Sequence, residues 1–286
     1  MASVNLPISK NLWGSYVTTV SLLLLVCYWS TITGTVQVLF QTGDMACAIF
    51  PPVIAAYVIW SRRSQWPSTA IAPNANGAAA LLAGAALAAL AVLGGSLTLA
   101  RFAFLFSLVG CILVACGATI LRFLAFPLTL LLFALPIPSP LYHALALPLQ
   151  AVAGRGAEII LNLLGFHAVR TGNSISLPSQ ILVVSQACSG VQSLRTLAFF
   201  CLIYSYWNES RIWLRAALVA AVLPASILMN IVRISVTGML GEFNHKYTQG
   251  TWHSALGYVT SLLAFCVIWG VHTLVSHGFD REAAAA

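Results

Sequence analysis

Charged side chains are scarce in this sequence, which has only 13 Lys and Arg and 6 Asp and Glu among its 286 residues, or 7% in total. A soluble domain carries about 25% charged residues. Because 60% of the residues are hydrophobic, the chain has too little polar surface for a soluble globular fold. We therefore predict an all-α integral membrane protein, since helices satisfy every backbone hydrogen bond within a bilayer.

The sequence also lacks cysteines at the close spacing of a metal site or a redox motif, and it has no long run of Lys and Arg residues. Six of the seven cysteines fall in expected helices at no metal-ligand spacing, and we interpret them as packing residues: Cys27, Cys47, Cys111, Cys116, Cys201 and Cys266. The seventh, Cys188, has no second cysteine two or three residues away, which argues against a thiol-disulfide enzyme. The basic residues lie at the ends of apolar runs, so the net charge of +7 does not indicate a nucleic-acid partner. We expect no metal and no organic cofactor.

Apolar runs of about 20 residues predict eight transmembrane helices. Their expected ranges are 12–33, 45–60, 78–97, 102–121, 123–135, 188–207, 212–240 and 255–275. The range 141–164 is helical but carries several polar residues, so we expect it to lie in the membrane interface. The range 166–184 alternates around Thr171-Gly172-Asn173, which predicts a small extracytoplasmic β-hairpin. The Ala/Gly-rich range 78–97 is suited to close helix packing.

The basic residues also set the predicted orientation. Both termini are cytoplasmic, and eight helices close the topology, if six arginines lie inside: Arg62, Arg63, Arg122, Arg211, Arg215 and Arg281. No cleavable signal peptide is evident, because the first apolar run is long enough to span a bilayer. We expect a multi-pass protein of the cytoplasmic (inner) membrane, in which residues 1–122 and 123–286 form one integrated bundle.

Cys188 is the candidate nucleophile. A β-prone run gives way to Gln186-Ala-Cys-Ser-Gly190, and a long apolar helix then begins, so Cys188 lies at a helix mouth. Free N–H groups and the positive end of the helix dipole favour an anionic thiolate there. The alternative is that Cys188 is one more small packing residue. Ser189 and Gly190 are small enough for a substrate backbone to approach the sulfur.

Two further reactive residues fall at the same predicted depth. Arg233 lies about 20 residues, or roughly 30 Å, into the range 212–240 and so near its outer end. An arginine within a membrane normally faces a polar cavity or a partner, although snorkelling to the headgroups is the alternative. His253 begins the last helix on the same side, where a neutral imidazole can act as a base. Its alternative is an interfacial histidine beside Trp252. His272 lies at the cytoplasmic end of that helix and is excluded by the predicted topology.

Supporting residues are expected around these three. Asn230 shares a helix face with Arg233 and could hold its guanidinium or a substrate amide. Arg195 could face the same cavity and support the thiolate or a carboxylate, or it could form a structural ion pair with Glu158. Together with Gln186, Ser189 and Gly190, these residues complete the candidate site.

The motifs Ala187-Cys-Ser-Gly190, Asn230-x-x-Arg233 and His253, in this order, resemble those of the exosortase/archaeosortase family. The resemblance covers roughly residues 126–275, including the Pro-Ile-Pro loop and the Thr-Gly-Asn-x-Ile segment. It implies that residues 123–286 form a catalytic membrane region of a cysteine protease/transpeptidase. Such an enzyme processes C-terminal sorting signals, each made of a short motif, a transmembrane helix and a basic tail. By this resemblance Cys188 is the nucleophile, Arg233 stabilises the transition state and His253 is the acid/base.

The resemblance implies membrane-anchored protein substrates, a thioester intermediate, and a polysaccharide or lipid acceptor at the outer face of the membrane. The chain departs from the family pattern at Gln186, where many members have Glu, and at Gln192, where many have Arg. These departures bear on substrate preference rather than on the triad. Two other functions stay open. One is a transporter or lipid flippase with Arg195, Arg233 and Glu158 in a polar pathway, and the other is a non-catalytic subunit of a polysaccharide-export system.

Overall fold

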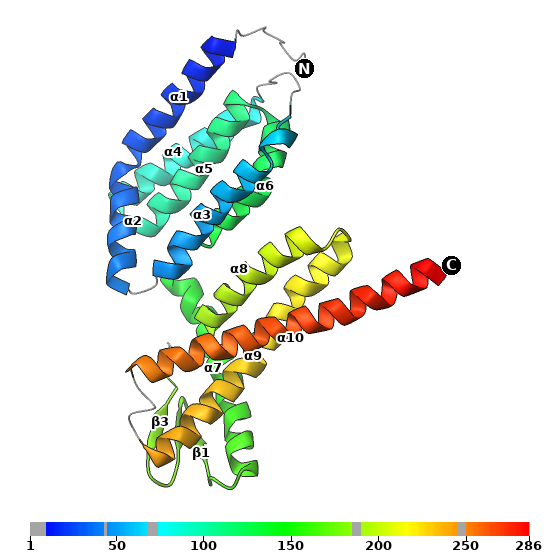
Figure 1. The fold of residues 1–286 in the computed structure, drawn as a ribbon. Helices are drawn as coiled ribbons and strands as arrows, with labels where there is room; N and C mark the ends of the chain where they lie inside the picture. Colours follow the sequence, from blue (N-terminus) through cyan, green and yellow to red (C-terminus); the bar gives the residue numbers. More distant parts are fainter. Residues whose placement is uncertain (1–9, 43–44, 68–73, 185–189, 245–249, 286) are drawn as a thin grey trace. The chain divides into compact units, whose positions relative to one another are not determined.

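The computed structural model describes residues 10–42, 45–67, 74–184, 190–244 and 250–285 (Figure 1). Over these ranges the protein is mostly helical with one small sheet, which confirms the predicted helical class. The chain divides into two compact units, Met1–Pro136 and Ile137–Ala286, and the junction falls in the proline-rich loop.

The first unit is helical. Its elements are α1 (Lys10–Cys27), α2 (Trp29–Thr42), α3 (Met45–Ser61), the short 3-10 helix η1 (Arg63–Gln65), α4 (Asn76–Leu93), α5 (Leu97–Ala115) and α6 (Ala118–Leu132). The range 12–33, which we expected to be one helix, is instead broken at Tyr28, and α1 and α2 bend by 59°. The Tyr28 hydroxyl hydrogen-bonds to Ser107 Oγ at 2.8 Å, and its ring meets Phe104 edge-on. The break in the helix therefore coincides with contacts between Tyr28 and α5. The apolar pattern around Tyr28 could not predict these contacts, because α5 is far away in the sequence.

Glycines set the packing and the boundaries of α4, α5 and α6. A Cβ on Gly110 would lie 2.8 Å from the backbone nitrogen of Leu81, so α4 and α5 pack closely, as the Ala/Gly-rich sequence predicts. Gly117 adopts φ +84° between α5 and α6, a conformation that interrupts a helix. Because α6 already begins at Ala118, Arg122 lies within this helix, and our expectation that the basic residues lie at the ends of apolar runs is wrong for Arg122.

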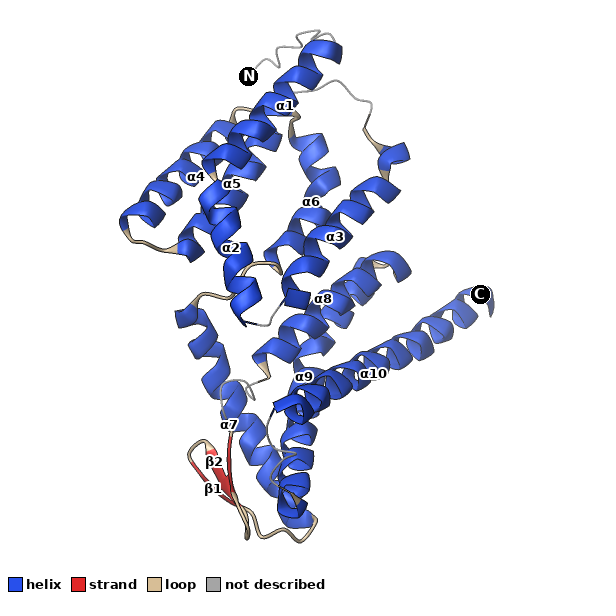
Figure 2. Ribbon diagram, turned by 60° about the vertical axis from the view of Figure 1, so that its left-hand side comes forward, coloured by secondary structure: helices blue, strands red, loops and turns tan. Residues whose placement is uncertain are grey.

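The second unit is built around a long apolar helix of 32 residues. Its elements are α7 (Ser139–Leu163), β1 (Val169–Thr171), β2 (Ser174–Ser176), β3 (Ile181–Val183), α8 (Val191–Asn208), α9 (Ile212–Phe243) and α10 (Gly250–Ala285). α9 packs against α7, α8 and α10, and the three strands lie beside α7 (Figures 1 and 2). This arrangement brings the beginnings of α8 and α10 to α9.

The strands form an antiparallel sheet in the order β1-β2-β3. Thr171 pairs with Ser174 across Gly172 and Asn173, which confirms the predicted turn and hairpin. A third strand, β3, extends the hairpin, and its Leu182 pairs with Ile175. Ile175 is fully buried in a core of apolar side chains from α7, α9 and the sheet, so the sheet is an integral part of the second unit.

Five described helices are long and apolar enough to cross a membrane, or six if the bent α1–α2 pair is one broken span. These five indicate a multi-pass membrane protein, but the eight expected spans are not confirmed. α3 and α6 are shorter apolar helices, and α8 is not among the five because Gln192, Ser193, Arg195 and Thr196 make its first turns polar. α7, which we expected to lie in the interface, is one of the five.

Candidate functional site

The mouth of α8 lies directly against α9. Gly190, the residue before α8, is buried and has a left-handed backbone with φ +80°, which glycine adopts without steric penalty. A Cβ at this position would lie 2.9 Å from Nδ2 of Asn230 and 3.0 Å from its Cγ. Glycine is therefore required twice here, by the backbone angle and by the approach to Asn230, which is only 4% exposed.

Arg233 connects α9 to α10. It follows Asn230 by three residues and is 7% exposed, so it is not extended toward lipid headgroups. Its guanidinium lies against Gly257 of α10, where a Cβ would be 3.3 Å from Cζ and 3.5 Å from Nη2. A cation desolvated between helices interacts strongly with negative charge, because the local dielectric constant is low.

Gly257 relates this contact to the predicted acid/base. It lies four residues after His253 on α10, about one helical turn, so the two residues share a helix face. His253 belongs to α10, but its side chain is outside the described part of the structure. Cys188, Ser189 and Gln186 lie outside the described residues altogether. Their roles stay predictions.

The described residues therefore bring three helix segments together. Gly190 at the mouth of α8 contacts Asn230 of α9, and Arg233 of α9 contacts Gly257 in the second turn of α10. In the sequence, Gly190 is two residues from Cys188. A carbonyl group bound between the two helix beginnings would lie beside a buried guanidinium. Negative charge that develops on its oxygen would be stabilised there.

Arg195 is half-buried on α8, five residues after Gly190. Glu158, the alternative ion-pair partner considered for it, uses Oε1 to accept the backbone N–H of Arg170 at 2.8 Å. This carboxylate of α7 thus fixes strand β1. Both roles considered for Arg195, support of the reaction and support of the fold, stay predictions.

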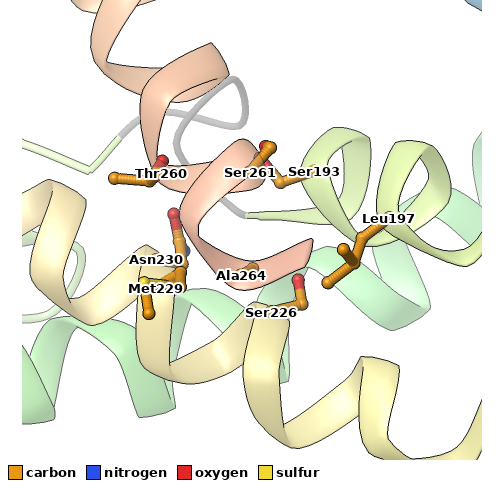
Figure 3. A pocket seen from close by; sticks show the side chains of 8 residues that line it. All are labelled: Ser193, Leu197, Ser226, Met229, Asn230, Thr260, Ser261 and Ala264. Carbon is orange, nitrogen blue, oxygen red and sulfur yellow. The ribbon is translucent and has the colours of Figure 1, made fainter. Parts of the chain in front are cut away.

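A small polar pocket lies between α8, α9 and α10, about one turn deeper than the contact between Gly190 and Asn230. Figure 3 shows its lining residues: Ser193, Leu197, Ser226, Met229, Asn230, Thr260, Ser261 and Ala264. The Thr260 hydroxyl donates to the Leu256 carbonyl and the Ser261 hydroxyl donates to the Gly257 carbonyl, each at 2.8 Å, so their lone pairs can accept hydrogen bonds. A polar pocket within apolar helices suits water or a small polar group.

Hydrogen bonds fix the sheet to its neighbouring helices. Asn162 of α7 donates Nδ2 to the Ala168 carbonyl and accepts the Ala168 N–H, at 2.9 and 2.8 Å. Gln180, at the start of β3, donates Nε2 to the Gly238 carbonyl of α9 at 3.1 Å. The backbone carbonyl of Gln180 accepts the Leu177 N–H at 2.8 Å. The strand that precedes the mouth of α8 is thereby held in place.

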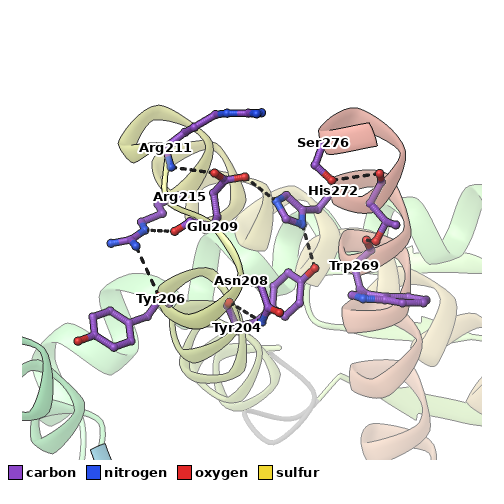
Figure 4. Close-up of polar contacts among 10 residues, drawn as sticks. Tyr204, Tyr206, Asn208, Glu209, Arg211, Arg215, Trp269, His272 and Ser276 are labelled. Atoms are coloured by element: carbon purple, nitrogen blue, oxygen red, sulfur yellow. Dashed lines mark hydrogen bonds and ion pairs between the residues drawn. The ribbon is translucent and has the colours of Figure 1, made fainter. Parts of the chain in front are cut away.

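A second polar cluster joins α8, α9 and α10 near their other end (Figure 4). His272 of α10 places Nε2 3.1 Å from Oε2 of Glu209 and Nδ1 2.9 Å from the Tyr204 hydroxyl. Burial opposes ionisation of Glu209, but the Arg211 backbone N–H, the His272 side chain and the Arg211 charge outweigh it and lower the pKa of Glu209. His272 follows Gly257 by 15 residues, or about 22 Å along α10, so it anchors this helix far from Arg233.

Sequence reasoning missed Gly257 and the pocket hydroxyls. Gly257 has no reactive group, and only its spacing of four residues from His253 could have identified it. Ser226 likewise precedes Asn230 by four residues, a spacing that puts both on one helix face. Among the described residues, no three His, Cys, Asp or Glu side chains gather as a metal site.

Residues 39–270 match the model of a family described as Transmembrane exosortase (Exosortase_EpsH). The matched range takes in parts of both compact units and the positions of Asn230, Arg233, His253 and Gly257. Neither a curated protein nor a solved structure matches the chain.

Proposed function

We propose that this chain, which belongs to the transmembrane exosortase family, is a membrane-embedded cysteine protease/transpeptidase that cleaves C-terminal sorting signals. The observation that carries the proposal is the buried Arg233 guanidinium against Gly257. The desolvated Arg233 cation lies in the region where α8 and α10 begin. From the sequence we assign the nucleophile to the beginning of α8 and the acid/base to the beginning of α10.

The reaction follows from the residue types. The Cys188 thiolate attacks the carbonyl carbon of the scissile peptide bond, and Arg233 stabilises the oxyanion of the tetrahedral intermediate. The C–N bond breaks, His253 gives the leaving amine the proton that it took from the Cys188 thiol, and the exported protein remains as a thioester on Cys188. His253 then deprotonates an acceptor or water, which attacks the thioester and releases the thiolate.

The remaining candidate residues support this chemistry. Asn230 holds the mouth of α8 and is available to a substrate amide, while Gly190 and Ser189 leave room for the substrate backbone. Arg195 and Gln186 lie within a few residues of Cys188 in the sequence and support the thiolate or the substrate. The active site faces the extracytoplasmic side of the cytoplasmic membrane, both termini are cytoplasmic, and the acceptor is a polysaccharide or a lipid.

Processing of a reporter in cells tests the proposal. The reporter is an exported domain followed by the C-terminal motif, transmembrane helix and basic tail of a candidate substrate encoded in the same genome. We expect wild type to shorten it and Cys188→Ala to leave it intact at equal membrane levels. Arg233→Lys should be strongly impaired, because an ammonium lacks the planar fork of donors. A reporter–enzyme adduct that hydroxylamine releases would identify the thioester.

The matched control is Cys266→Ala, which removes an exposed thiol from α10. We expect this variant to process the reporter like wild type. If Cys188→Ala also retains processing, the nucleophile assignment is wrong, and the transporter interpretation, which tolerates this change, becomes the better one.

A further inference from the structure

The β3 edge of the sheet has backbone groups that point away from β2. Val184 donates its N–H to the Asn173 carbonyl of the neighbouring strand segment at 2.8 Å. Hydrogen-bonded positions alternate along an antiparallel pair, so Ile181 and Val183 direct their N–H and C=O groups away from β2. No described residue donates to or accepts from these outward groups.

At the opposite edge the outward N–H group is capped. Arg170 carries the outward N–H of β1, because Val169 and Thr171 lie at the positions that face β2. The Glu158 carboxylate on α7 accepts this N–H at 2.8 Å. Within the described residues β3 has no such cap, and an uncapped edge is a template for an added strand.

The β3 edge is also fixed in space and apolar on its open face. Ile181 and Val183 are 68% and 61% exposed, whereas Leu182 between them packs against the core of the unit. The strand is held at its start by the bond from Gln180 to the Gly238 carbonyl of α9. A partner that pairs with β3 therefore meets a preformed edge, and little ordering of the protein opposes binding.

We propose that the β3 edge binds the extended segment of the substrate's sorting signal as an added fourth strand, an inference that rests on the proposed function. The outward groups of Ile181 and Val183 bind an extended backbone and cannot pair with a helix, whose own N–H and C=O groups are already used. Their side chains select uncharged, apolar side chains at alternate positions of the segment. In the sequence β3 ends seven residues before Gly190, so it is the strand nearest along the chain to the mouth of α8 and to the proposed nucleophile Cys188.

The first test removes one outward donor. Val183→Pro deletes the Val183 N–H but leaves the Val184 N–H, which pairs with β2. We expect the rate of reporter processing to fall by at least about tenfold, since one hydrogen bond is lost and the proline ring obstructs the partner strand. Val183→Ala should lower it about twofold to fivefold. The matched control Val169→Ala, on the other edge strand and also 61% exposed, should process like wild type.

The outcomes separate this inference from the proposed function. Processing by Val183→Pro at the wild-type rate, with none by Cys188→Ala, overturns strand addition and leaves the protease assignment intact. Processing by Cys188→Ala overturns the proposed function itself. The two variants therefore test strand addition and the protease assignment separately.

Cross-linking keeps the inference testable if Val183→Pro does not fold. In a Cys188→Ala background, Val183→Cys is oxidised with reporters that carry a single cysteine at each successive position of the extended segment. Strand pairing predicts disulfides at every second position, because alternate side chains share a face. Equal yields at all positions, or none, overturn it. A disulfide between two copies of the enzyme would instead show that the edge pairs with itself.

Discussion

Replacing Gly190 by alanine perturbs the mouth of α8 in two ways that can be separated. The backbone angle of φ +80° costs an alanine roughly 1–2 kcal/mol. The new Cβ would also lie 2.9 Å from Asn230 Nδ2, well below the 3.4 Å at which ordinary contact begins. Asn230 or the first turn of α8 must therefore move by about 0.5 Å to restore normal contact.

Gly165→Ala is the matched control. Gly165 has a similar φ of +86°, but nothing lies within 4 Å of its would-be Cβ, so alanine there meets the backbone strain without the clash. Both variants should lose about 1–2 kcal/mol of stability from the strain. Only Gly190→Ala should lose catalysis as well, on the order of tenfold, because a 1 Å misplacement near a reactive group can cost ~10²-fold.

The assay is the rate of reporter processing per inserted enzyme molecule, with the melting temperature in detergent measured in parallel. Equal processing rates for Gly190→Ala and Gly165→Ala would refute the reasoning, because the contact with Asn230 would then have no part in catalysis. A large loss in Gly165→Ala would do so too, since strain alone would account for the effect.

Two more predictions concern contacts of α10, that of Gly257 with Arg233 and that of His272 with Glu209. Gly257→Val should lower processing by at least about tenfold, because its side chain displaces the Arg233 guanidinium; Gly270→Val on the same helix meets open space and should process like wild type, and equal rates for the two would contradict this. The pKa of Glu209 is lowered from its ordinary 4.5 in the folded protein. The contacts of the Glu209 carboxylate, including that with His272, therefore stabilise the fold fully above pH 4.5. This stabilisation is lost as the pH falls through the folded-state pKa. The melting temperature of wild type should therefore fall more steeply below pH 4.5 than that of Glu209→Gln, and parallel curves would contradict the assignment.

Local sequence patterns predicted the elements that depend on local physics. The apolar range 212–240 corresponds to α9, Ile212–Phe243, and the Gly172-Asn173 turn corresponds to the β1–β2 hairpin. The break at Tyr28 escaped prediction because its hydrogen bond to Ser107 joins residues 79 positions apart. The β-prone run before Gln186 corresponds to β3, whereas the bond that fixes this strand, from Gln180 to the Gly238 carbonyl of α9, joins residues 58 positions apart and escaped prediction.

The candidate site shows the same division. Arg233 could be identified from the sequence because an arginine in an apolar helix is costly and requires a reason. Its actual neighbour could not be identified, because Gly257 matters through the absence of a side chain. The packing of Gly190 on Asn230 likewise depends on how α8 and α9 meet, which no spacing within either helix specifies. Reactive groups are visible in a sequence, whereas the surfaces that position them are not.

The cap that Glu158 places on Arg170 has a consequence for stoichiometry. A three-stranded sheet with two uncapped edges could grow from both sides, and copies of the chain could then stack into an open-ended array. With the outward N–H of Arg170 on β1 already bound at 2.8 Å, strand addition as we propose it is directed to β3, and it would stop after one strand of a partner that offers no further edge. On this proposal the sheet would bind one partner strand at a time, and Glu158 of α7, at the opposite edge of the sheet, would set this limit.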